Sequence, residues 1–311
     1  MRVLVTGGAG FIGSHVVERL LANGVAARVL DNLSTGNREN LPASHPGLEM
    51  ILGDIRDSAA VDRATEGADA VIHLAAVASV QASMEDPFGT HQTNFDGTLN
   101  LLVHARGHGV RRFLYASSAA IYGDTTALPV AEDELPRPLS PYAADKLAGE
   151  HYLRYFVSKR GLNATAFRFF NIFGPRQDPG SPYSGVISIF ADRAKTGRGV
   201  TIFGDGRQTR DFVFVGDLAD ILVGALDRDG LAGEVMNVGT GHECSLLDLL
   251  AALESLSGRR IEREHAPPRI GDIVRSCADV SRLRARFGSV PQTSVRDGLR
   301  ELLRHSGLLV A

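Results

Sequence analysis

The chain has 311 residues, of which 44 % are hydrophobic and 22 % are charged, a composition typical of a globular protein with a buried core. Its 33 Lys and Arg against 36 Asp and Glu give a formal net charge of −3, which lacks the strong positive charge of a nucleic-acid-binding protein. No apolar run reaches the roughly 18 residues of a membrane helix. We therefore expect neither a nucleic-acid nor a membrane partner.

The cysteines and the first residues indicate a compartment. Cys244 and Cys277 form neither a CxxC pair nor a disulfide framework. The chain begins with Met1-Arg2 and passes directly into a short apolar run, without a signal-peptide pattern. We therefore expect a cytoplasmic protein.

One histidine pair has the spacing of helical metal ligands. His104 and His108 are four residues apart, and Gly107 and Gly109 flank the second. We interpret this pattern as a helix end whose histidines interact with the helix dipole, and we expect no metal site.

The first 170 residues alternate between short apolar runs and amphipathic helical patterns. Helical patterns separate most of the runs, notably at residues 94–106 and 142–159. Buried strands that alternate with helices predict an α/β fold, a doubly wound parallel sheet of the Rossmann type with helices on both faces. The expected strands lie at residues 3–5, 27–30, 50–52, 70–74, 112–116 and 164–168.

The pattern changes after Asn171. Residues 174–185 are rich in Gly, Pro and Ser and predict a loop. Later segments predict helices near 186–196, 217–225 and 245–256, and strands near 200–203 and 235–238. We expect residues 1–170 to form a dinucleotide-binding domain and residues 171–311 a smaller mixed α/β lobe, with segments near 210–245 returning to the main sheet.

A glycine-rich turn follows the first expected strand. Gly7, Gly10 and Gly13 have the spacing G-x-x-G-x-x-G, where the strand ends and a helix begins. Glycines there permit a tight turn and a close approach of backbone N–H groups to a pyrophosphate. The pattern predicts a dinucleotide site.

Two acidic residues at strand ends refine this prediction. Asp31 lies 18 residues beyond Gly13, at the end of the second strand. A carboxylate there binds the adenosine ribose hydroxyls and disfavours a 2′-phosphate, so we expect NAD in preference to NADP. Asp54 follows the third strand, where its carboxylate is placed to accept a hydrogen bond from adenine.

A Tyr-x-x-x-Lys pair carries the candidate chemistry. Ser140 and Pro141 have the pattern of a helix N-cap and first helical position, which places Tyr142 and Lys146 one turn apart on one face. A phenol with a pKa near ~10 is a weak base at neutral pH, but a neighbouring ammonium and a cationic nicotinamide both favour the phenolate. We expect Tyr142 to take a proton from a substrate hydroxyl as hydride leaves to NAD.

Ser118 lies just past the fifth expected strand. This is the carboxyl edge of the sheet, where open α/β folds bind ligands. Its hydroxyl is placed either to orient the substrate oxygen or to relay the proton.

Taken in order, these motifs resemble the extended short-chain dehydrogenases/reductases of the nucleotide-sugar epimerase/dehydratase group, and most of all the UDP-hexose 4-epimerases. The resemblance covers nearly the whole chain. Besides the glycine turn, Ser118, Tyr142 and Lys146, its motifs are residues 31–36, His73-Leu74-Ala75-Ala76, Asn94-x-x-Gly97-Thr98, residues 168–175, Arg210-Asp211-Phe212 and Arg269-x-Gly271-Asp272.

The resemblance implies the residues that hold cofactor and substrate. The UDP-sugar would be bound by Ser118, Asn171, Arg210, Arg269 and Asp272, and two guanidiniums suit a diphosphate through charge-assisted bonds. It also implies a homodimer formed through residues 94–106 and 142–159. In addition to the glycine turn, Tyr142 and Lys146, the NAD contacts would be Phe11, Ile12, Asp31, Asn32, Asp54, Ile55, Ala75 and Asn94.

The residues after Ser118 bear on the reaction. Related dehydratases carry an Asp-Glu pair there and related decarboxylases a Glu, whereas this chain has Ala119 and Ala120, which neither give nor take a proton. The resemblance therefore implies a 4-epimerase that oxidises the sugar at C4, turns the 4-keto sugar over and reduces it on the other face, with NAD as a bound catalyst. A dehydratase or a reductase on the same scaffold is the alternative, and a nucleotide sensor without turnover is disfavoured because Tyr142 and Lys146 are both present.

The sugar is predicted from one position. In bacterial 4-epimerases limited to plain hexoses a Tyr stands four residues beyond the Gly-Asp pair, where this chain has Ser276. The small side chain leaves room for an N-acetyl group, so we expect UDP-GlcNAc and UDP-GalNAc as substrates, with UDP-Glc and UDP-Gal left open. Residues 177–185 also resemble epimerases that act on N-acetylated sugars.

Overall fold

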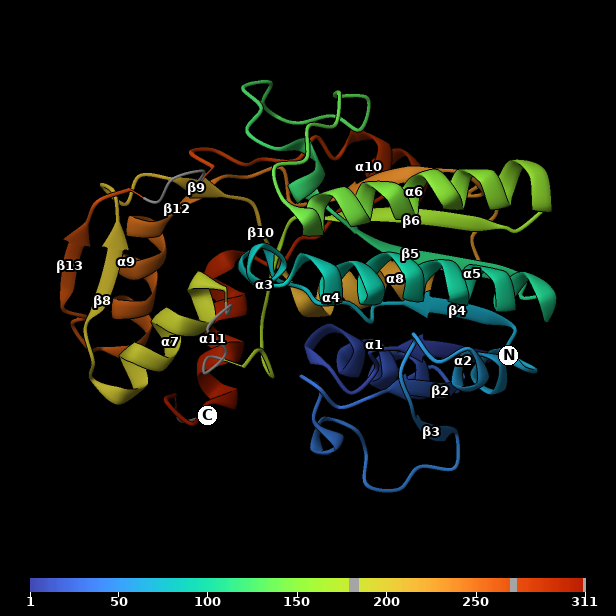
Figure 1. Ribbon diagram of the computed structural model, residues 1–311. Helices are drawn as coiled ribbons and strands as arrows, with labels where there is room; N and C mark the ends of the chain where they lie inside the picture. The colour runs from blue at the N-terminus through green and yellow to red at the C-terminus, as the bar shows by residue number, and fades with distance from the viewer. Residues whose placement is uncertain (179–184, 269–272, 310–311) are drawn as a thin grey trace. The chain divides into compact units, whose positions relative to one another are not determined.

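The computed structural model describes residues 1–178, 185–268 and 273–309. Its main sheet has seven strands in the order β11-β6-β5-β4-β1-β2-β3 (Figure 1). The pairs that β1 forms with β2 and β4, and the pairs β2–β3 and β4–β5, are parallel. The seven strands are β1 (Arg2–Thr6), β2 (Ala26–Asp31), β3 (Leu48–Leu52), β4 (Ala70–His73), β5 (Arg112–Ser118), β6 (Ala164–Phe169) and β11 (Val235–Val238).

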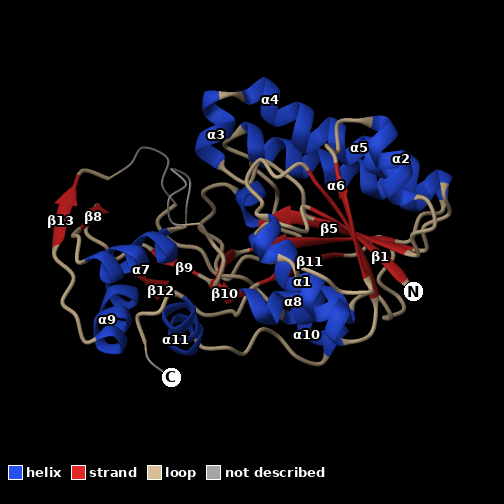
Figure 2. Ribbon diagram, turned by 90° about the horizontal axis from the view of Figure 1, so that it is seen from below, coloured by secondary structure: helices blue, strands red, loops and turns tan. Residues whose placement is uncertain are grey.

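This strand order confirms the predicted α/β fold of the Rossmann type. Val3, Leu4 and Val5 of β1 are all fully buried, as expected for a central strand covered on both faces. Figure 2 shows α2, α5 and α6 on one face of the sheet and α1 on the other. The long helices of this part are α1 (Phe11–Ala22), α2 (Ser58–Thr65), α5 (Gly97–Gly107) and α6 (Pro141–Arg160), and the short ones are η1 (Arg38–Asn40), α3 (Val80–Glu85), α4 (Pro87–His91) and η3 (Ala119–Tyr122).

The start of α6 is as predicted. The Ser140 side chain accepts a hydrogen bond from the Ala143 backbone N–H at 3.2 Å, and Pro141 occupies the first turn. The cap and the fixed φ of proline begin the helix at this residue. Tyr142 and Lys146 therefore lie in its first two turns.

The prediction of one regular helix over residues 94–106 was wrong at its start. Gln92–Asp96 forms a π-helical turn, and the α-helix α5 begins only at Gly97. The Asn94 side chain bonds both backbone groups of Val77, accepting from its N–H at 2.7 Å and donating to its carbonyl at 3.1 Å. This tertiary anchor accompanies the irregular turn, and such turns occur often at functional sites.

The described chain divides into two compact units. Unit 1 comprises residues 1–121, 136–168 and 219–236, and unit 2 comprises residues 122–135, 169–218 and 237–311. β11 belongs to the main sheet beside β6, whereas β9, β10 and β12 pair elsewhere. The linear division expected near residue 170 stays a prediction.

Unit 2 contains three two-stranded sheets and its own core. β7 (Asn171–Phe173) pairs in parallel with β10 (Phe212–Phe214), β8 (Val200–Phe203) in parallel with β13 (Arg263–Ala266), and β9 (Thr209–Arg210) antiparallel with β12 (Cys244–Ser245).

The structure confirms the helices predicted near 186–196, 217–225 and 245–256 and the strands predicted near 200–203 and 235–238. The later helices are α7 (Val186–Thr196), α8 (Val215–Gly224), α9 (Leu246–Ser257), α10 (Ser281–Phe287) and α11 (Val295–His305).

Among the described residues, no helix combines the length and apolar character that crossing a membrane requires.

Candidate active site

The glycine turn between β1 and α1 leaves no room for side chains. Gly7 has φ +68°, and a Cβ there would lie 2.9 Å from the backbone of Ala75. A Cβ on Gly13 would lie 2.1 Å from the carbonyl oxygen of Gly7. Gly10 is the N-cap of α1, followed by Phe11 and Ile12, so the first N–H groups of the helix have no side-chain cap. This cradle fits the pyrophosphate of a dinucleotide.

Asp31 is held rigidly beside this cradle. Its carboxylate accepts hydrogen bonds from the Ala9 N–H at 2.9 Å and the Leu33 N–H at 2.8 Å. Gly36 approaches the carboxylate so closely that a Cβ there would lie 3.0 Å from its Oδ1. The buried carboxylate is fixed at the end of β2, where it suits ribose hydroxyls and opposes a 2′-phosphate.

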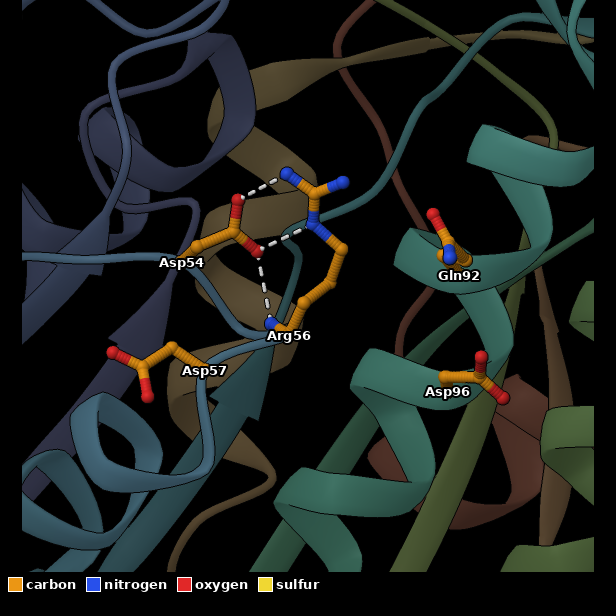
Figure 3. Close-up of a pocket in the computed structure, with 5 residues that line it drawn as sticks. All are labelled: Asp54, Arg56, Asp57, Gln92 and Asp96. Carbon is orange, nitrogen blue, oxygen red and sulfur yellow. Dashed lines mark hydrogen bonds and ion pairs between the residues drawn. The ribbon is translucent and has the colours of Figure 1, made fainter.

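Asp54 and Arg56 form one side of a cavity of about 520 Å³, which Figure 3 shows facing Gln92 and Asp96. Arg56 donates from Nε and Nη2 to the two Asp54 oxygens at 3.0 and 2.8 Å. Asn32 donates to the same carboxylate at 2.9 Å. The Arg56 hydrogen bond is the main reason that the pKa of Asp54 falls to about 2. Asp54 is therefore a fixed anionic acceptor at neutral pH, next to the buried Ile55.

The structure brings Ser118, Tyr142 and Lys146 together. Lys146 Nζ donates to the Ala116 carbonyl at 2.8 Å and lies 5.9 Å from the centre of the Tyr142 ring. Burial lowers the pKa of Lys146 to about 8, against the opposing charge of Asp145. Burial also raises the pKa of Tyr142, while its hydrogen bond with Ser118 lowers it. The phenol thus lies between a hydroxyl and an ammonium, both of which favour its ionised form.

A buried hydrogen-bond chain beneath the glycine turn was missed by the sequence analysis. Thr98 Oγ1 donates to the Asn94 carbonyl at 2.6 Å and lies 2.9 Å from His73 Nε2. Because Thr98 gives its only hydroxyl proton to Asn94, the proton between Thr98 and His73 must be on His73 Nε2. The other ring nitrogen, Nδ1, therefore carries no proton and accepts a hydrogen bond from Thr6 Oγ1 at 2.7 Å. Burial first, and the charge of Lys146 second, lower the pKa of His73 to about 3. The neutral ring of His73, at the end of β4, thus connects β1 to the start of α5.

Thr6 extends this chain to the cradle itself. Its Oγ1 accepts from the backbone N–H groups of Leu74 and Ala75, both at 3.2 Å. The order His-x-Ala after a strand is visible in the sequence, but the residues that the ring bonds are 67 and 25 positions away. Only the fold brings them to one place.

A buried ion pair supports the helix that carries Tyr142 and Lys146. Arg168 donates to the two Glu150 oxygens at 2.9 and 2.8 Å, and both side chains are no more than 2 % exposed. Ser117 donates to the same carboxylate at 2.5 Å. The pair joins α6 to β5 and β6, so it fixes the helix on which the candidate base lies. Sequence reasoning did not single it out.

Two of the residues expected to hold the nucleotide, Asn171 and Arg210, lie in unit 2. Asn171 and Arg210 line a cavity of about 430 Å³ together with Phe203, Gln208 and a second cation, Arg193, which the sequence analysis missed. Two guanidiniums suit a diphosphate.

Arg210 is held by backbone carbonyls in unit 2. Its Nη1 donates to the carbonyls of Thr209 at 2.8 Å and Ile273 at 2.7 Å. Ser276 is half-buried in the same unit. Arg269 and Asp272 lie outside the described residues.

Comparisons with known proteins identify the family of the chain. Residues 3–239 match the NAD dependent epimerase/dehydratase family. A UDP-glucose 4-epimerase of Mycolicibacterium smegmatis is 42 % identical over 303 residues, 96 % of each chain.

Two solved structures are similar over nearly their whole length. The UDP-N-acetylglucosamine 4-epimerase of Methanobrevibacter ruminantium, in complex with UDP-N-acetylmuramic acid, has a TM-score of 0.94 and 36 % identity, over 98 % of this chain and 97 % of that one. The UDP-glucose 4-epimerase of Thermus thermophilus, in complex with NAD, has a TM-score of 0.90 and 43 % identity, over 98 % of both chains. The chain therefore belongs to the NAD dependent epimerase/dehydratase family, the nucleotide-sugar branch of the extended short-chain dehydrogenases/reductases, and its cofactor is NAD.

Proposed function

We propose that the chain is a UDP-sugar 4-epimerase that interconverts UDP-GlcNAc and UDP-GalNAc through a 4-keto intermediate, and that also accepts UDP-Glc and UDP-Gal. The observation that carries this proposal is the cluster of Ser118, Tyr142 and Lys146 in the same unit as the dinucleotide cradle. Relatives with UDP-sugar 4-epimerase names over nearly the full length support the reaction class.

In the proposed mechanism Tyr142 is the acid–base residue. NAD, which the glycine turn and Asp31 would hold, would supply the hydride acceptor and donor for C4. Tyr142 takes the proton of the C4 hydroxyl as the 4-keto sugar forms, and gives it back when the alcohol is restored. Burial opposes ionisation of the phenol, so the positive charge of Lys146 and the hydrogen bond from Ser118 must offset it.

Ser118 has a second role in this proposal. Its hydroxyl lies at the end of β5 and accepts a hydrogen bond from the Ala120 N–H at 3.2 Å, which fixes its position. A fixed hydroxyl beside the phenol orients the substrate oxygen or passes the proton to Tyr142.

Epimerisation is favoured over elimination by the residues that follow Ser118. Ala119 and Ala120 begin the short helix η3, at the position where related dehydratases carry an acid pair. Methyl groups neither protonate a leaving hydroxyl nor remove a second proton. A dehydratase would need another residue for that step.

Unit 2 is proposed to hold the nucleotide. Asn171, Arg193 and Arg210 line its cavity, and we assign the diphosphate to the two guanidiniums. Arg269 and Asp272 are part of this proposal on the resemblance alone. Tight binding of the diphosphate and weak binding of the hexose would allow the 4-keto sugar to rotate and present its other face. The small Ser276 supports an N-acetylated hexose.

The reaction is tested by incubating the protein with UDP-GlcNAc in the absence of added NAD and following the sugar by NMR. We expect UDP-GalNAc to form until the two epimers reach equilibrium, with no net oxidation or loss of water. Tyr142→Phe should abolish this conversion while it leaves the bound NAD in place. Loss of water would identify a dehydratase, and a requirement for stoichiometric cofactor would identify a reductase.

We also propose a homodimer formed through α5 and α6. Large apolar side chains are exposed on these helices and on the neighbouring α3 and α4: Met84, Phe88, Val103, Tyr152 and Tyr155. Such a patch typically marks a protein interface. Sedimentation is expected to give the mass of two chains for the parent and of one chain for Val103→Asp.

A cytoplasmic location is part of the proposal, and the two free thiols support it.

A further inference from the structure

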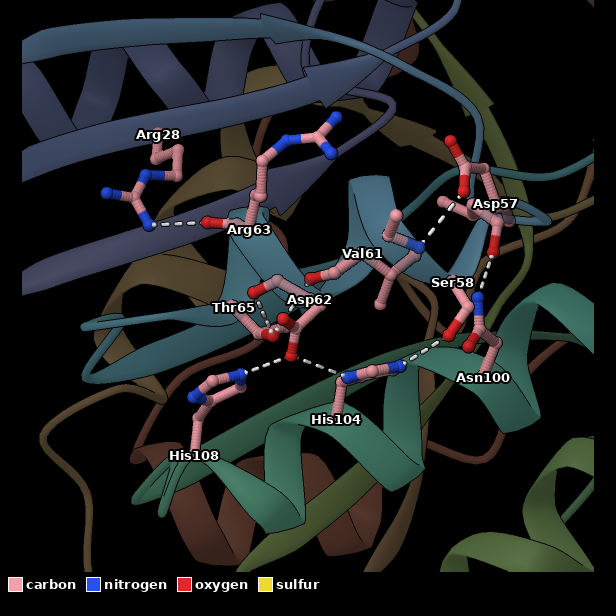
Figure 4. Close-up of polar contacts among 12 residues, drawn as sticks. Arg28, Asp57, Ser58, Val61, Asp62, Arg63, Thr65, Asn100, His104 and His108 are labelled. Carbon is pink, nitrogen blue, oxygen red and sulfur yellow. Dashed lines mark hydrogen bonds and ion pairs between the residues drawn. The ribbon is translucent and has the colours of Figure 1, made fainter.

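Three metal-ligating side chains of unit 1, none of them assigned to cofactor or substrate, converge on the surface. Asp62 Oδ1 of α2 lies 3.0 Å from His104 Nδ1 and 2.7 Å from His108 Nε2, both at the end of α5. The two imidazole rings are stacked at 20°. Figure 4 shows the carboxylate of Asp62 between the two rings. The three ligand atoms all lie within 4.8 Å of one another.

We propose that Asp62, His104 and His108 form a binding site for one divalent transition-metal ion of the Zn²⁺ class. Imidazole nitrogen and carboxylate oxygen are ligands that Zn²⁺ prefers, whereas Mg²⁺ and Ca²⁺ prefer sites built of oxygen alone. Two ligand atoms bound about 2.1 Å from one ion are about 3.0–3.4 Å apart. The separations between the carboxylate oxygen and the two nitrogens, 3.0 and 2.7 Å, are close to this spacing, and the two nitrogens lie within 4.8 Å of each other.

Ser58 supplies a supporting contact for this site. Its Oγ lies 2.9 Å from His104 Nε2, on the far side of the ring from Asp62. When His104 donates its Nε2–H to this hydroxyl, the lone pair of Nδ1 faces Asp62. Metal-bound histidines are held in this way by a partner on their second nitrogen.

The site is open to solvent on one side. The Asp62 side chain is 54 % exposed, and the two histidines are 21 and 28 % exposed. An ion can therefore reach the three ligands directly, and water can complete its coordination. Without an ion the same atoms are satisfied by hydrogen bonds from the imidazoles to the carboxylate, which is the competing arrangement.

An ion here would join two segments whose neighbouring residues line the cavity beside Asp54. Asp57 is the N-cap of α2, and Gln92 and Asp96 lie in the turn that precedes α5. These three residues line the cavity next to Asp54. Asn100 of α5 already donates to the Ile55 carbonyl at 2.8 Å. The proposed ion adds a further link between these elements, so its role is to stabilise unit 1.

Titration of the untagged, chelator-treated full chain with Zn²⁺ tests the proposal. Calorimetry is expected to show one ion per chain, and Zn²⁺ should raise the unfolding temperature because it binds the folded state. His104→Ala and His108→Ala should each weaken binding by at least about 10-fold, and Ser58→Ala by about 10-fold. His305→Ala, an exposed histidine of α11, is the matched control and should bind as the parent does.

Co²⁺ distinguishes this site from the two cysteines. The absorption spectrum of the Co²⁺-loaded protein should show nitrogen and oxygen ligation, without a thiolate charge-transfer band. The proposal is overturned if the parent binds no Zn²⁺, if the His104→Ala and His108→Ala variants bind as tightly as His305→Ala, or if the thiolate band appears.

Discussion

The ammonium of Lys146 lies 5.9 Å from the centre of the Tyr142 ring, one helical turn further along α6. Its hydrogen bond to the Ala116 carbonyl anchors it to β5, so its position does not depend on the phenol. Burial costs the ammonium part of its hydration, which lowers its pKa to about 8. The buried ammonium that supports Tyr142 as the proposed base therefore lowers the stability of the folded chain.

Replacing this lysine should change the pH dependence of stability. The pKa of Lys146 is about 8 in the folded chain and 10.5 when exposed, so the unfolded chain binds more protons between these values. Stability from this group therefore rises with pH in that window, by at most about 1.4 kcal/mol per pH unit. From pH 8 to 10, the unfolding free energy of the parent should therefore increase relative to that of Lys146→Met. Denaturant titrations at each pH measure it.

Lys159→Met is the matched control, because Lys159 lies on the same helix with an exposed side chain. The difference in unfolding free energy between Lys159→Met and the parent should stay constant from pH 8 to 10. A constant difference for Lys146→Met as well would show that the buried ammonium has an ordinary pKa.

Gly13→Ala should remove the cofactor. The added methyl group would lie 2.1 Å from the Gly7 carbonyl oxygen, so the turn must open. We expect the purified variant to lose most of its bound NAD, measured as nucleotide released on denaturation. Gly107→Ala, whose Cβ would meet no atom within 4 Å, should retain it. Equal NAD content in both variants would argue against this turn as the cradle.

Glu150→Ala should destabilise the chain strongly. It removes the carboxylate that accepts two hydrogen bonds from the buried Arg168 guanidinium, and the loss of one member of a buried ion pair costs about 3–5 kcal/mol. Urea unfolding measures the loss. Glu301→Ala removes one partner of an exposed pair with Arg304 and should cost less than about 1 kcal/mol. Comparable losses in the two variants would contradict the structural role given to the buried pair.

Ser276→Tyr should discriminate between the sugars. A tyrosine at this half-buried position would fill the space that we assign to the N-acetyl group. Turnover of UDP-GlcNAc should fall much further than turnover of UDP-Gal, measured as kcat/KM for each. Equal losses on both substrates would remove the acetyl-group assignment, and Ser276→Ala should leave both nearly unchanged.

The central strands of the sheet were predictable because they are buried. Runs such as Val3 to Val5 are apolar at every position, and the Ser140-Pro141 cap marked the start of α6 locally. The same local signals located the glycine turn and the Tyr142 and Lys146 pair.

Other features depend on contacts between distant residues. The tautomer of His73 follows from Thr6 and Thr98, on other elements. Asp62 lies 42 positions before His104, so the sequence pattern showed the two histidines without their carboxylate. The π-helical turn is likewise accompanied by hydrogen bonds between Asn94 and Val77, 17 positions apart. No local periodicity contains this information.

The most direct test of the account follows the hydrogen atom at C4 of the sugar. UDP-GlcNAc that carries deuterium at C4 should give UDP-GalNAc that retains the label at C4, because the atom leaves as hydride and returns within the same site. Loss of the label to ordinary water during epimerisation would contradict the account, since it would mean that C4 loses a proton and that the oxidised intermediate is never formed.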